Sequence, residues 1–561
     1  MGISKKYIYL LIVTGILLLF FVVPSNFGNE SKEHFNLLND QSWTYVPGVQ
    51  KSDGELRITP IGRVITHKDT STAQLNPPVN VRGPHLKVSG DFEVKASLKG
   101  VEEGATFQLY GQVPVIYDEW RQERQSVKIN VSPNIIKVSL WDGSSVSSID
   151  ERSYKRNIKN KADISIIRKS NKIFVKLNGK YLGSMPDHNV FINETVWFGV
   201  DANIGSDGWT LNSLMAKGLN NGMVELVPSP DLAVNQVKAD SLRKLSNSNL
   251  RKLPIGAAVS IYPLMTDTQY RQTVGREFSI ITPENSMKPQ FIHPQKNLYT
   301  FADADSVVEF AQKNQIMVHG HALVLSKANP QWMQKTPENQ RKQLLTDHIT
   351  EVVSHFKGKA AEWDVVNEPL SEDGVDYNPD RKGIRKQLWF DSMGEEYIDV
   401  AFKATKLADP NAKLYLNDFG IEKDGERWDA IVSLVQRLQS RGVPIDGVGF
   451  EAHVYHEPDL IDPVVLSQHI QTLAGMGIVS RISEIDVLGD KSEVQAKQFA
   501  DVLKVCLAQP TCTSYTTWGV SDRYGSTTLS DRYPITLGDS LIWDAKFNPK
   551  LSLSTLQNIL R

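Results

Sequence analysis

Hydrophobic and polar residues alternate with period two from about residue 36 to residue 218. In one segment four apolar residues are separated by single polar ones: Phe92, Val94, Ala96 and Leu98. A second alternating run ends at Asn178-Gly179 and resumes at Tyr181, and Asn-Gly between such runs is the strongest short-range signal of a β-hairpin. Many short strands of this kind, separated by Gly, Pro and Asp, predict an all-β sandwich over residues 36–218.

The pattern changes after this region. Residues 219–250 are polar and rich in Ser and Asn, which predicts a linker followed by a short helix. From residue 251 to residue 561, short apolar runs alternate with amphipathic windows. The clearest helix ends at Asp409-Pro410 and has six residues on its apolar face: Tyr397, Val400, Ala401, Ala404, Leu407 and Ala408.

Eight strand candidates lie in this second region, each followed by a helical window. They are near residues 255–260, 279–283, 316–324, 361–367, 413–418, 446–453, 479–486 and 513–520. A strand followed by a helix eight times predicts a (β/α)₈ TIM barrel, whose active site lies at the carboxyl ends of the strands. Polar side chains stand at those ends: Asn285, Lys288, His319, His321, Asn367, Glu368, Asn417, Asp418, Glu451, His453, Glu484, Asp486 and Trp518.

Two of these strand ends carry the candidate chemistry. The runs Trp363-Asp-Val-Val-Asn-Glu368-Pro369 and Arg481-Ile-Ser-Glu484-Ile-Asp486 each deliver a glutamate. Cleavage of a glycosidic bond needs a carboxylic acid for the leaving oxygen and a carboxylate for the developing oxocarbenium ion. A lone strand-end Glu is more often a solvated charge, but two of them within a repeating βα pattern favour Glu368 and Glu484 as a catalytic pair.

The chain from Leu253 to Arg561 resembles glycoside hydrolase family 10, the endo-β-1,4-xylanases. The stretches that carry the resemblance are Thr282–Lys288, Gly320–Leu323, Trp363–Pro369, Leu414–Asp418, Gly442–Asp446, Ser483–Asp486 and Trp518-Gly519. The resemblance implies a retaining, endo-acting enzyme that cleaves β-1,4-xylosidic bonds in xylan by double displacement. It implies that Glu368 is the acid/base and Glu484 the nucleophile.

The resemblance also implies roles for supporting residues. Asn367 is expected to bond the 2-hydroxyl of the sugar being cleaved, His453 to bond the nucleophile, and Trp518 to form an aromatic floor. The sugar sites on the non-reducing side would be lined by Asn285, Lys288 and His321. Three alternatives stay open: Lys288 as a surface charge, His319 with His321 as a metal pair, and Asp418 and Asp486 as structural residues. No third ligand at metal-site spacing accompanies the two histidines, and we expect no metal and no cofactor.

Four positions depart from the family pattern. Pro289 and Leu325 stand where the family usually has Trp, Glu451 replaces a Gln, and Ser526 replaces a second Trp after Trp518-Gly519. Loss of stacking residues leaves two alternatives open: the same retaining chemistry on a different β-linked glycan, or a degenerate carbohydrate-binding barrel. An ionised Glu451 would oppose the ionisation of Glu484 unless His453 is protonated between them, so we expect Glu451→Gln to move the acidic limb of the pH profile to lower pH.

The composition limits the class of protein. The 561 residues are 40% hydrophobic and 22% charged, which is typical of globular chains with more than one domain. The net charge of −2 gives no indication of a nucleic-acid partner. We expect a monomer that acts on a polysaccharide.

The sandwich weakly resembles concanavalin-like domains. Each of its five tryptophans is more readily a core residue than a sugar-binding one: Trp43, Trp120, Trp141, Trp197 and Trp209.

The first 28 residues predict export from the cytoplasm. An apolar run covers residues 7–23, and Lys5 and Lys6 precede it. This pattern favours an uncleaved signal anchor over a cleaved signal peptide, so we expect an extracytoplasmic body that is membrane-anchored, or secreted if cleaved.

The spacing of Cys506 and Cys512 fits either a small disulfide loop or a free buried pair. The family resemblance implies the disulfide, which persists in such a compartment.

Overall fold

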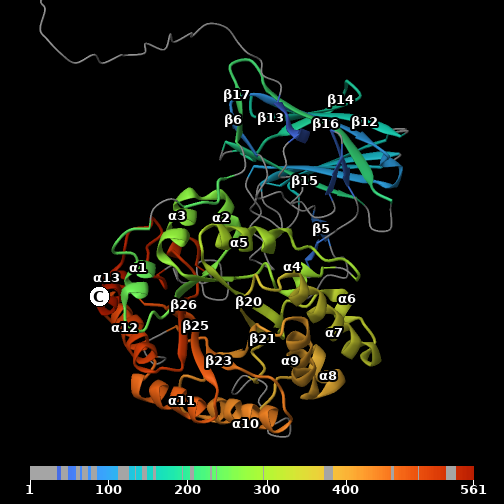
Figure 1. Ribbon diagram of the computed structural model, residues 1–561. Coiled ribbons are helices and arrows are strands. Elements are labelled where there is room, and N and C mark those ends of the chain that lie inside the picture. Colours follow the sequence, from blue (N-terminus) through green and yellow to red (C-terminus); the bar gives the residue numbers. More distant parts are fainter. Residues whose placement is uncertain are drawn as a thin grey trace, which may run out of the picture.

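Two folded units make up the part of the chain that can be described. The computed structural model describes residues 35–39, 49–52, 54–58, 63–65, 74–76, 85–111, 125–132, 134–141, 148–155, 160–191, 194–202, 207–227, 230–234, 237–294, 296–371, 383–455, 460–489, 492–525 and 539–561. Figure 1 shows an all-β unit standing over helices α2 (Ile261–Thr266), α3 (Thr268–Glu277) and α5 (Ala302–Lys313) of a barrel. The predicted signal anchor at residues 7–23 lies outside the described residues.

The first unit is the predicted β-sandwich, with two antiparallel sheets. One sheet has the order β14-β13-β12-β7-β16-β3-β2, with β1 also paired to β16, and the other has the order β11-β10-β9-β8-β15-β6-β17. A separate pair, β4 and β5, covers Arg63–Ile65 and Gln74–Asn76. The strands of the first sheet are β1 (Phe35–Asn36), β2 (Val49–Ser52), β3 (Glu55–Ile58), β7 (Phe92–Lys99), β12 (Lys161–Lys169), β13 (Lys172–Leu177), β14 (Lys180–Pro186) and β16 (Trp209–Gly218). Those of the second are β6 (His85–Ser89), β8 (Ala105–Tyr110), β9 (Ser126–Val131), β10 (Ile135–Trp141), β11 (Asp150–Lys155), β15 (Thr195–Ala202) and β17 (Met223–Val227).

The alternation in the sequence explains this packing. The four apolar residues of β7 that were identified from the pattern are all buried in the core between the sheets. Asn178 and Gly179 both have positive φ, 48° and 76°, and they form the turn between β13 and β14, so the hairpin prediction is confirmed. Trp141, Trp197 and Trp209 are buried, as expected for packing residues. Trp43 and Trp120 lie outside the described residues.

Strand β17 corrects the predicted boundary of the sandwich. It lies in the segment that we expected to be a linker, and it pairs with β6 from Met223↔Ser89 to Val227↔His85. The run Met-Val-Glu-Leu-Val has five residues, of which only Glu225 is polar, so the sequence shows no clear alternation there. Its side chains are exposed or half-buried in the structure. The sandwich therefore extends to Val227, while the short helix predicted before the barrel is present as α1 (Leu242–Ser248).

The second unit is the predicted closed barrel of eight parallel strands. Its order is β23-β22-β21-β20-β19-β18-β26-β25, and β23 also pairs with β25, which closes the ring. The strands are β18 (Ile255–Val259), β19 (Ile280–Pro283), β20 (Met317–Val324), β21 (Glu362–Asn367), β22 (Lys413–Asp418), β23 (Gly447–Phe450), β25 (Val479–Val487) and β26 (Cys512–Thr517), and the two-residue β24 (His453–Val454) pairs with the end of β25. All eight candidates are confirmed: six agree with the observed bounds to within two residues, the sixth is interrupted after Phe450, and the eighth ends three residues earlier than predicted, at Thr517.

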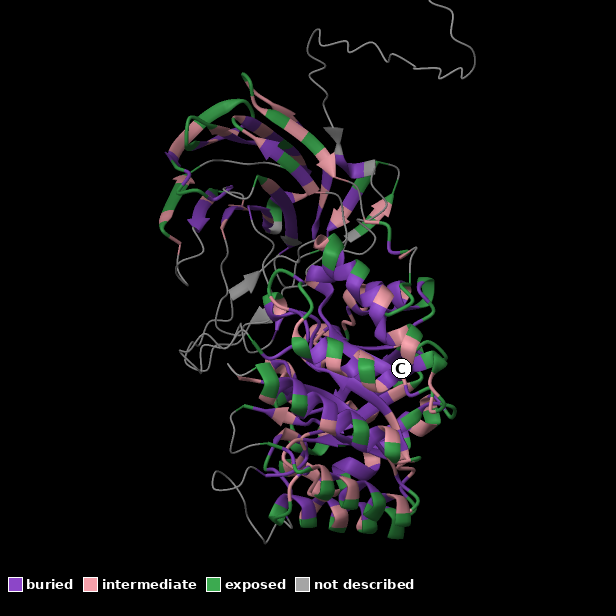
Figure 2. Cartoon of the chain, turned by 90° about the vertical axis from the view of Figure 1, so that its left-hand side faces the viewer, coloured by how far each residue is buried: buried purple, intermediate pink, exposed green. Residues whose placement is uncertain are grey.

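Helices surround the barrel and shield its apolar strands. Besides α1, α2, α3 and α5 they are α4 (Pro289–Ile292), α6 (Gln331–Gln334), α7 (Glu338–His355), α8 (Leu388–Met393), α9 (Glu396–Ala408), α10 (Glu426–Ser440), α11 (Pro463–Gly475), α12 (Ser492–Ala508) and α13 (Leu551–Leu560). Figure 2 shows burial along the barrel strands and the inner faces of these helices. The predicted helix is α9, but Leu407 is 83% exposed, because its position lies beyond the edge of the buried face. Among the described residues, the helices are too short or too polar to cross a membrane.

Candidate active site

The carboxyl ends of the barrel strands bring the predicted residues together. Glu368 follows β21 directly, Glu484 lies near the end of β25, and Glu451 lies between β23 and β24. The backbone of Glu368 has a φ of 49°, a conformation that residues with a Cβ rarely adopt, and its N–H donates to the carbonyl of Asn417 at 2.8 Å. Backbone strain of this kind is typical of active sites, because the surrounding structure must hold it.

Asn417, at the end of β22, is the centre of the site's hydrogen bonds. Its Nδ2 lies 2.7 Å from Asn367 Oδ1, 2.8 Å from Glu484 Oε1 and 3.1 Å from Glu451 Oε1. Its Oδ1 accepts a hydrogen bond from Ser483 at 2.6 Å, which fixes the orientation of the amide. The sequence placed Asn417 at a strand end without giving it a role, and only the geometry reveals that it bridges two carboxylates.

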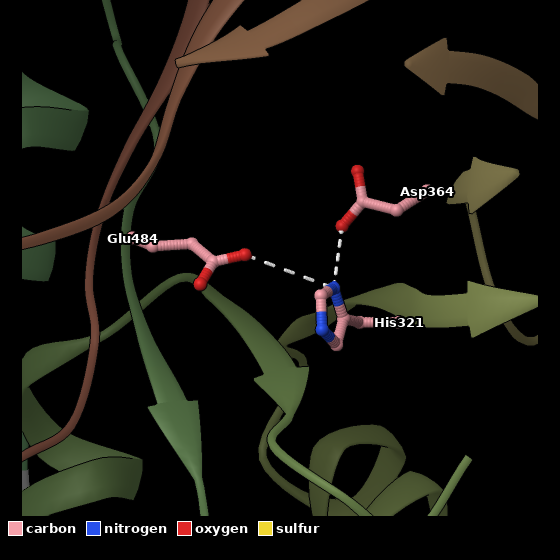
Figure 3. A group of neighbouring side chains, drawn as sticks. All are labelled: His321, Asp364 and Glu484. Atoms are coloured by element: carbon pink, nitrogen blue, oxygen red, sulfur yellow. Dashed lines mark hydrogen bonds and ion pairs between the residues drawn. The ribbon is translucent and has the colours of Figure 1, made fainter. Parts of the chain in front are cut away.

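Glu484 has the environment of an ionised nucleophile. Its carboxyl is buried, 3.4 Å from His453 Nε2 and 3.9 Å from His321 Nδ1. Burial opposes the ionisation of Glu484, but the hydrogen bond from His453 and the charge of His321 outweigh it and hold its pKa below the usual value. Figure 3 shows His321 between Asp364 and Glu484, with its Nδ1 also 2.9 Å from Asp364 Oδ2.

His453 is held in place from its other side. Its Nδ1 lies 2.7 Å from Asp486 Oδ1, and Tyr455 stacks on the ring at a centroid distance of 5.7 Å. Burial alone would lower the pKa of His453, but the neighbouring acidic groups of Tyr455 and Asp486 raise it well above its ordinary value. The raised pKa favours the protonated form of His453, which faces Glu484, the residue that the resemblance implied it would bond. Asp486 contacts His453 from the other side of the ring.

Glu451 joins this cluster as a buried carboxyl whose surroundings favour the protonated form. It is 3% exposed, and its Oε2 lies 3.5 Å from His453 Nε2. Burial and the negative charge of Glu484 raise the pKa of Glu451 well above its ordinary value. These opposite shifts favour the proton on Glu451 and the charge on Glu484, and the pH profile of Glu451→Gln decides whether the expected displacement of the acidic limb occurs. The sequence indicated a third carboxylate but not which of the two would favour the proton.

Glu368 has a different environment, as an acid/base needs. Its side chain is about one quarter exposed, and its Oε2 lies 3.5 Å from Nη2 of the buried Arg385. The Arg385 Nε donates to the carbonyl of Leu370 at 3.0 Å, which fixes the guanidinium beside the strand end. Arg385 was missed in the sequence because it lies well after Glu368 in an irregular segment. Asp418 accepts a hydrogen bond from the backbone N–H of Leu370 and contacts Arg427.

The remaining predicted residues line the same end of the barrel. Lys288 Nζ donates to Asn285 Oδ1 at 2.9 Å, and both side chains are half-buried. Trp518 meets His321 edge-on at a centroid distance of 5.2 Å. Glu284, which the sequence left without a role, faces the same cluster, and burial raises its pKa to about 7.

Two further sequence predictions concern histidines and cysteines. His319 and His321 both contact Asp364: His319 Nε2 lies 2.8 Å from one of its oxygens and His321 Nδ1 lies 2.9 Å from the other. His319 Nδ1 also lies 3.0 Å from Glu362, so both of its ring nitrogens face carboxylates of neighbouring residues. Cys506 and Cys512 form a disulfide, as the resemblance implied.

The departures from the family pattern are partly visible. Pro289 is buried as the first residue of α4, and Leu325 is buried after β20. Neither side chain offers the flat, accessible ring that a sugar stacks on. Ser526 lies outside the described residues.

Comparisons with known proteins agree with this geometry. The sequence model of glycosyl hydrolase family 10 matches residues 241–559. Endo-1,4-beta-xylanase B of Thermotoga neapolitana is 33% identical over 318 residues, which is 55% of this chain and 88% of that relative. The structure of native xylanase 10B from Thermotoga maritima superimposes with a TM-score of 0.53 at 33% identity, over 57% of this chain and 98% of that one. Xylanase 10B from Thermotoga petrophila, solved with xylobiose, gives a TM-score of 0.53 at 32% identity, over 58% and 98% of the two chains.

Proposed function

The chain belongs to glycosyl hydrolase family 10, and we propose from this premise that its barrel hydrolyses the β-1,4-xylosidic bonds of xylan by a retaining double displacement. The enzyme is an endo-1,4-β-xylanase-like glycoside hydrolase, like the relatives that it matches. The observation that carries the proposal is the unequal environment of the two strand-end glutamates. Glu484 is held ionised among Asn417, His453 and His321, while Glu368 is part-exposed beside Arg385.

The first step uses both glutamates. Glu484 attacks the anomeric carbon from one face of the sugar ring, and Glu368 protonates the leaving glycosidic oxygen, so a glycosyl ester forms on Glu484. The Asn417 N–H and the His453 cation keep the attacking carboxylate oriented and unprotonated. In the second step Glu368, now a carboxylate, takes a proton from water, and the water cleaves the ester. The anomeric configuration is retained after two inversions.

The supporting residues position the sugar. Asn367 is held by Asn417 at 2.7 Å, which leaves its amide N–H groups to bond the 2-hydroxyl of the bound sugar. Asn285, Lys288 and His321 are assigned to the sugar sites on the non-reducing side, and Trp518 to the floor beneath the reacting ring. The arrangement fits this assignment because these side chains converge on the end of the barrel that holds Glu368 and Glu484.

A second candidate keeps the chemistry and changes the glycan. Pro289 and Leu325 remove two stacking surfaces, and such surfaces contribute apolar area and ring contacts to sugar binding. The test is release of reducing sugar from xylan, arabinoxylan, β-glucan and mannan at equal mass concentration. We expect the highest rate on a xylan, with products longer than a single sugar. Faster hydrolysis of glucan or mannan than of xylan would show that the substrate is not xylan. Absence of hydrolysis on all four polysaccharides would contradict the proposal that the protein is a glycoside hydrolase.

We also propose an extracytoplasmic location, with residues 7–23 as a membrane anchor. The Cys506–Cys512 disulfide supports this location, because disulfides persist mainly outside the cytoplasm. The concanavalin-like sandwich is proposed to hold polysaccharide near the barrel, and the enzyme to act as a monomer. Membrane fractionation of cells that express the full chain tests the anchor: recovery in the soluble extracellular fraction would indicate cleavage.

A further inference from the structure

The carboxyl groups beside the nucleophile have too few hydrogen-bond donors. Five oxygen atoms surround Asn417 Nδ2 and His453 Nε2: both oxygens of Glu451, both of Glu484, and Asn367 Oδ1. The Asn417 amide supplies two hydrogens and His453 Nε2 supplies one. Among the described residues of this buried cluster, three donor hydrogens therefore face five oxygen atoms, and the remaining oxygen positions can be satisfied by a proton on Glu451 or by a cation in its place.

The distances in the cluster match those between metal ligands. His453 Nε2 lies 3.4 Å from Glu484 Oε2 and 3.5 Å from Glu451 Oε2, which is long for charged hydrogen bonds. In a tetrahedral site with metal–ligand bonds of 2.0–2.2 Å, neighbouring ligand atoms lie about 3.3–3.5 Å apart. One ligand atom from each of the three residues lies within 4.8 Å of the other two. The Nδ1 of His453 is already bound to Asp486 at 2.7 Å, which is the partner that metal-ligating histidines usually have.

We propose that Glu451, His453 and Glu484 form a binding site for a divalent transition-metal ion, such as Zn²⁺, that reversibly inhibits the enzyme. Binding displaces the proton of His453 Nε2 and that of Glu451, and the ion takes two carboxylate oxygens and one imidazole nitrogen. A fourth position is left toward the cleft, because the His453 side chain is 13% exposed. The nucleophile is then unable to attack. Glu451 creates the site, since an amide at this position would offer no anionic oxygen.

The neighbouring cluster of His321, Asp364 and Glu484 does not share this geometry. There His321 Nδ1 lies 2.9 Å from Asp364 and 3.9 Å from Glu484 (Figure 3), whereas His453 Nε2 is nearly equidistant from its two carboxylates. The shorter contact has the length of an ordinary charged hydrogen bond, and the longer one exceeds the spacing of neighbouring ligands in a tetrahedral site. We therefore place the ion at Glu451 rather than at Asp364.

The test measures metal binding apart from catalysis. Co²⁺ bound by imidazole and carboxylate in a low-coordinate site absorbs visible light, so it is titrated into chelator-treated full-length protein and displaced by Zn²⁺. We expect one equivalent to bind to the native chain and to the Glu368→Gln variant, and binding at least about tenfold weaker in Glu451→Gln. Xylobiose in excess should weaken Co²⁺ binding, because both occupy the same end of the barrel. The two cysteines of the chain are joined to each other, so free thiols do not contribute.

Inhibition provides the second measurement. Each protein is compared with its own metal-free rate, and Zn²⁺ should half-inhibit the native enzyme at a concentration at least about tenfold below that for Glu451→Gln. Addition of EDTA should restore the native rate. Equal sensitivity of the two proteins, or native protein that binds no Co²⁺, would overturn the proposal. Because Co²⁺ binding needs no substrate turnover, that failure is distinguishable from an error in the assigned glycan.

Discussion

Individual residues in this site serve more than one partner. Asn417 donates to both Glu451 and Glu484, and His453 faces the same two carboxylates from the opposite side. The surroundings lower the pKa of Glu484 and raise that of Glu451, which favours a charge on the first and a proton on the second. This division lets two acidic groups lie together in a buried site without leaving two uncompensated charges.

Removal of either catalytic glutamate should give a different pattern across substrates. Glu484→Gln removes the nucleophile, so activity on xylan and on aryl xylosides should both be nearly abolished. Glu368→Gln should lower the rate on xylan roughly 10²–10⁴-fold but spare aryl xylosides with good leaving groups, which need little protonation. Steady-state rates on a series of leaving groups check this. Equal losses on polymer and activated substrate in Glu368→Gln would reverse the role assignment.

Retention of configuration is a separate prediction. Since Asn417 and His453 hold the carboxylate of Glu484 and its pKa is lowered, we expect it to react as a nucleophile in the covalent route rather than to leave direct attack to water. Proton NMR of the first minutes of xylo-oligosaccharide hydrolysis should show the β-anomer before mutarotation. An initial α-anomer would exclude double displacement.

His453 should control the acidic limb of the pH profile. Its hydrogen bond helps to lower the pKa of Glu484, so His453→Ala should raise that pKa and move the acidic limb to higher pH. A hydrogen bond to a charged group contributes about 1.5–3 kcal/mol, which corresponds to a displacement of about 1–2 pH units. Initial rates at saturating substrate, in the presence of EDTA, give the limb. An unchanged limb would mean that His453 is not the group that keeps Glu484 ionised.

Glu451→Gln is the matched control for that experiment. Because burial and Glu484 raise the pKa of Glu451, its carboxyl is already neutral in the acidic range, and an amide of the same shape changes no charge there. The acidic limb should therefore stay where it is in the native enzyme. A displacement to lower pH would show that Glu451 is ionised alongside Glu484.

The catalytic residues were predictable at this scale, and their protonation was not. Glu368 and Glu484 end apolar strand runs, so both the spacing and the family resemblance identify them. Asn417 and Arg385 gain their roles only from contacts between segments that are distant in the sequence. The sequence also left open which of Glu451 and Glu484 ionises, because that depends on the donors that face each carboxyl.

At the scale of elements, the segment before the barrel is anchored more firmly than its polar composition indicates. Asn314, at the end of α5, donates to the carbonyl of Leu232 and accepts from the N–H of Val234, both at 2.8 Å. The side chain of Val234 packs against Gly275 of α3, where an added Cβ would approach it to 2.5 Å. The sequence predicted a linker here because Ser and Asn are common in loops, and it gave no indication of this clamp.

Asn314→Ala should destabilise the protein without changing its chemistry. The substitution leaves the carbonyl of Leu232 and the N–H of Val234 without their partner, at a cost of about 1–3 kcal/mol in the free energy of unfolding. Chemical denaturation followed by tryptophan fluorescence measures this cost. Gln312→Ala, an exposed position on the same helix, serves as control and should change stability little. Equal effects of the two substitutions would mean that the clamp contributes nothing.

At the scale of the whole molecule, the sandwich and the barrel share an apolar contact. Tyr110 and Trp197 of the sandwich belong to the same buried cluster as Leu232 and the barrel core. The two-domain order was predictable, because period-two alternation and the βα repeat are distinct patterns. The contact between them was not, since Tyr110 and Trp197 lie on strands whose outer face has no signature in a single sequence.

We predict that the barrel remains active without the sandwich if the clamp segment is kept. The residues assigned to catalysis all lie on the barrel. Tyr110 and Trp197, through which the sandwich contacts the barrel, are not among them. A protein that begins at Asp231 retains Leu232 and Val234, whereas one that begins at Asp240 loses both. The longer form should cleave xylotetraose at near full-length rates and melt at a higher temperature than the shorter one. If the sandwich holds polymer near the barrel by raising its effective concentration, both forms should also lose activity on insoluble xylan.

Two outcomes would contradict this prediction. If the protein that begins at Asp231 folds but fails to cleave xylotetraose, the sandwich contributes to the active site. If it keeps full activity on insoluble xylan, the sandwich is only a spacer.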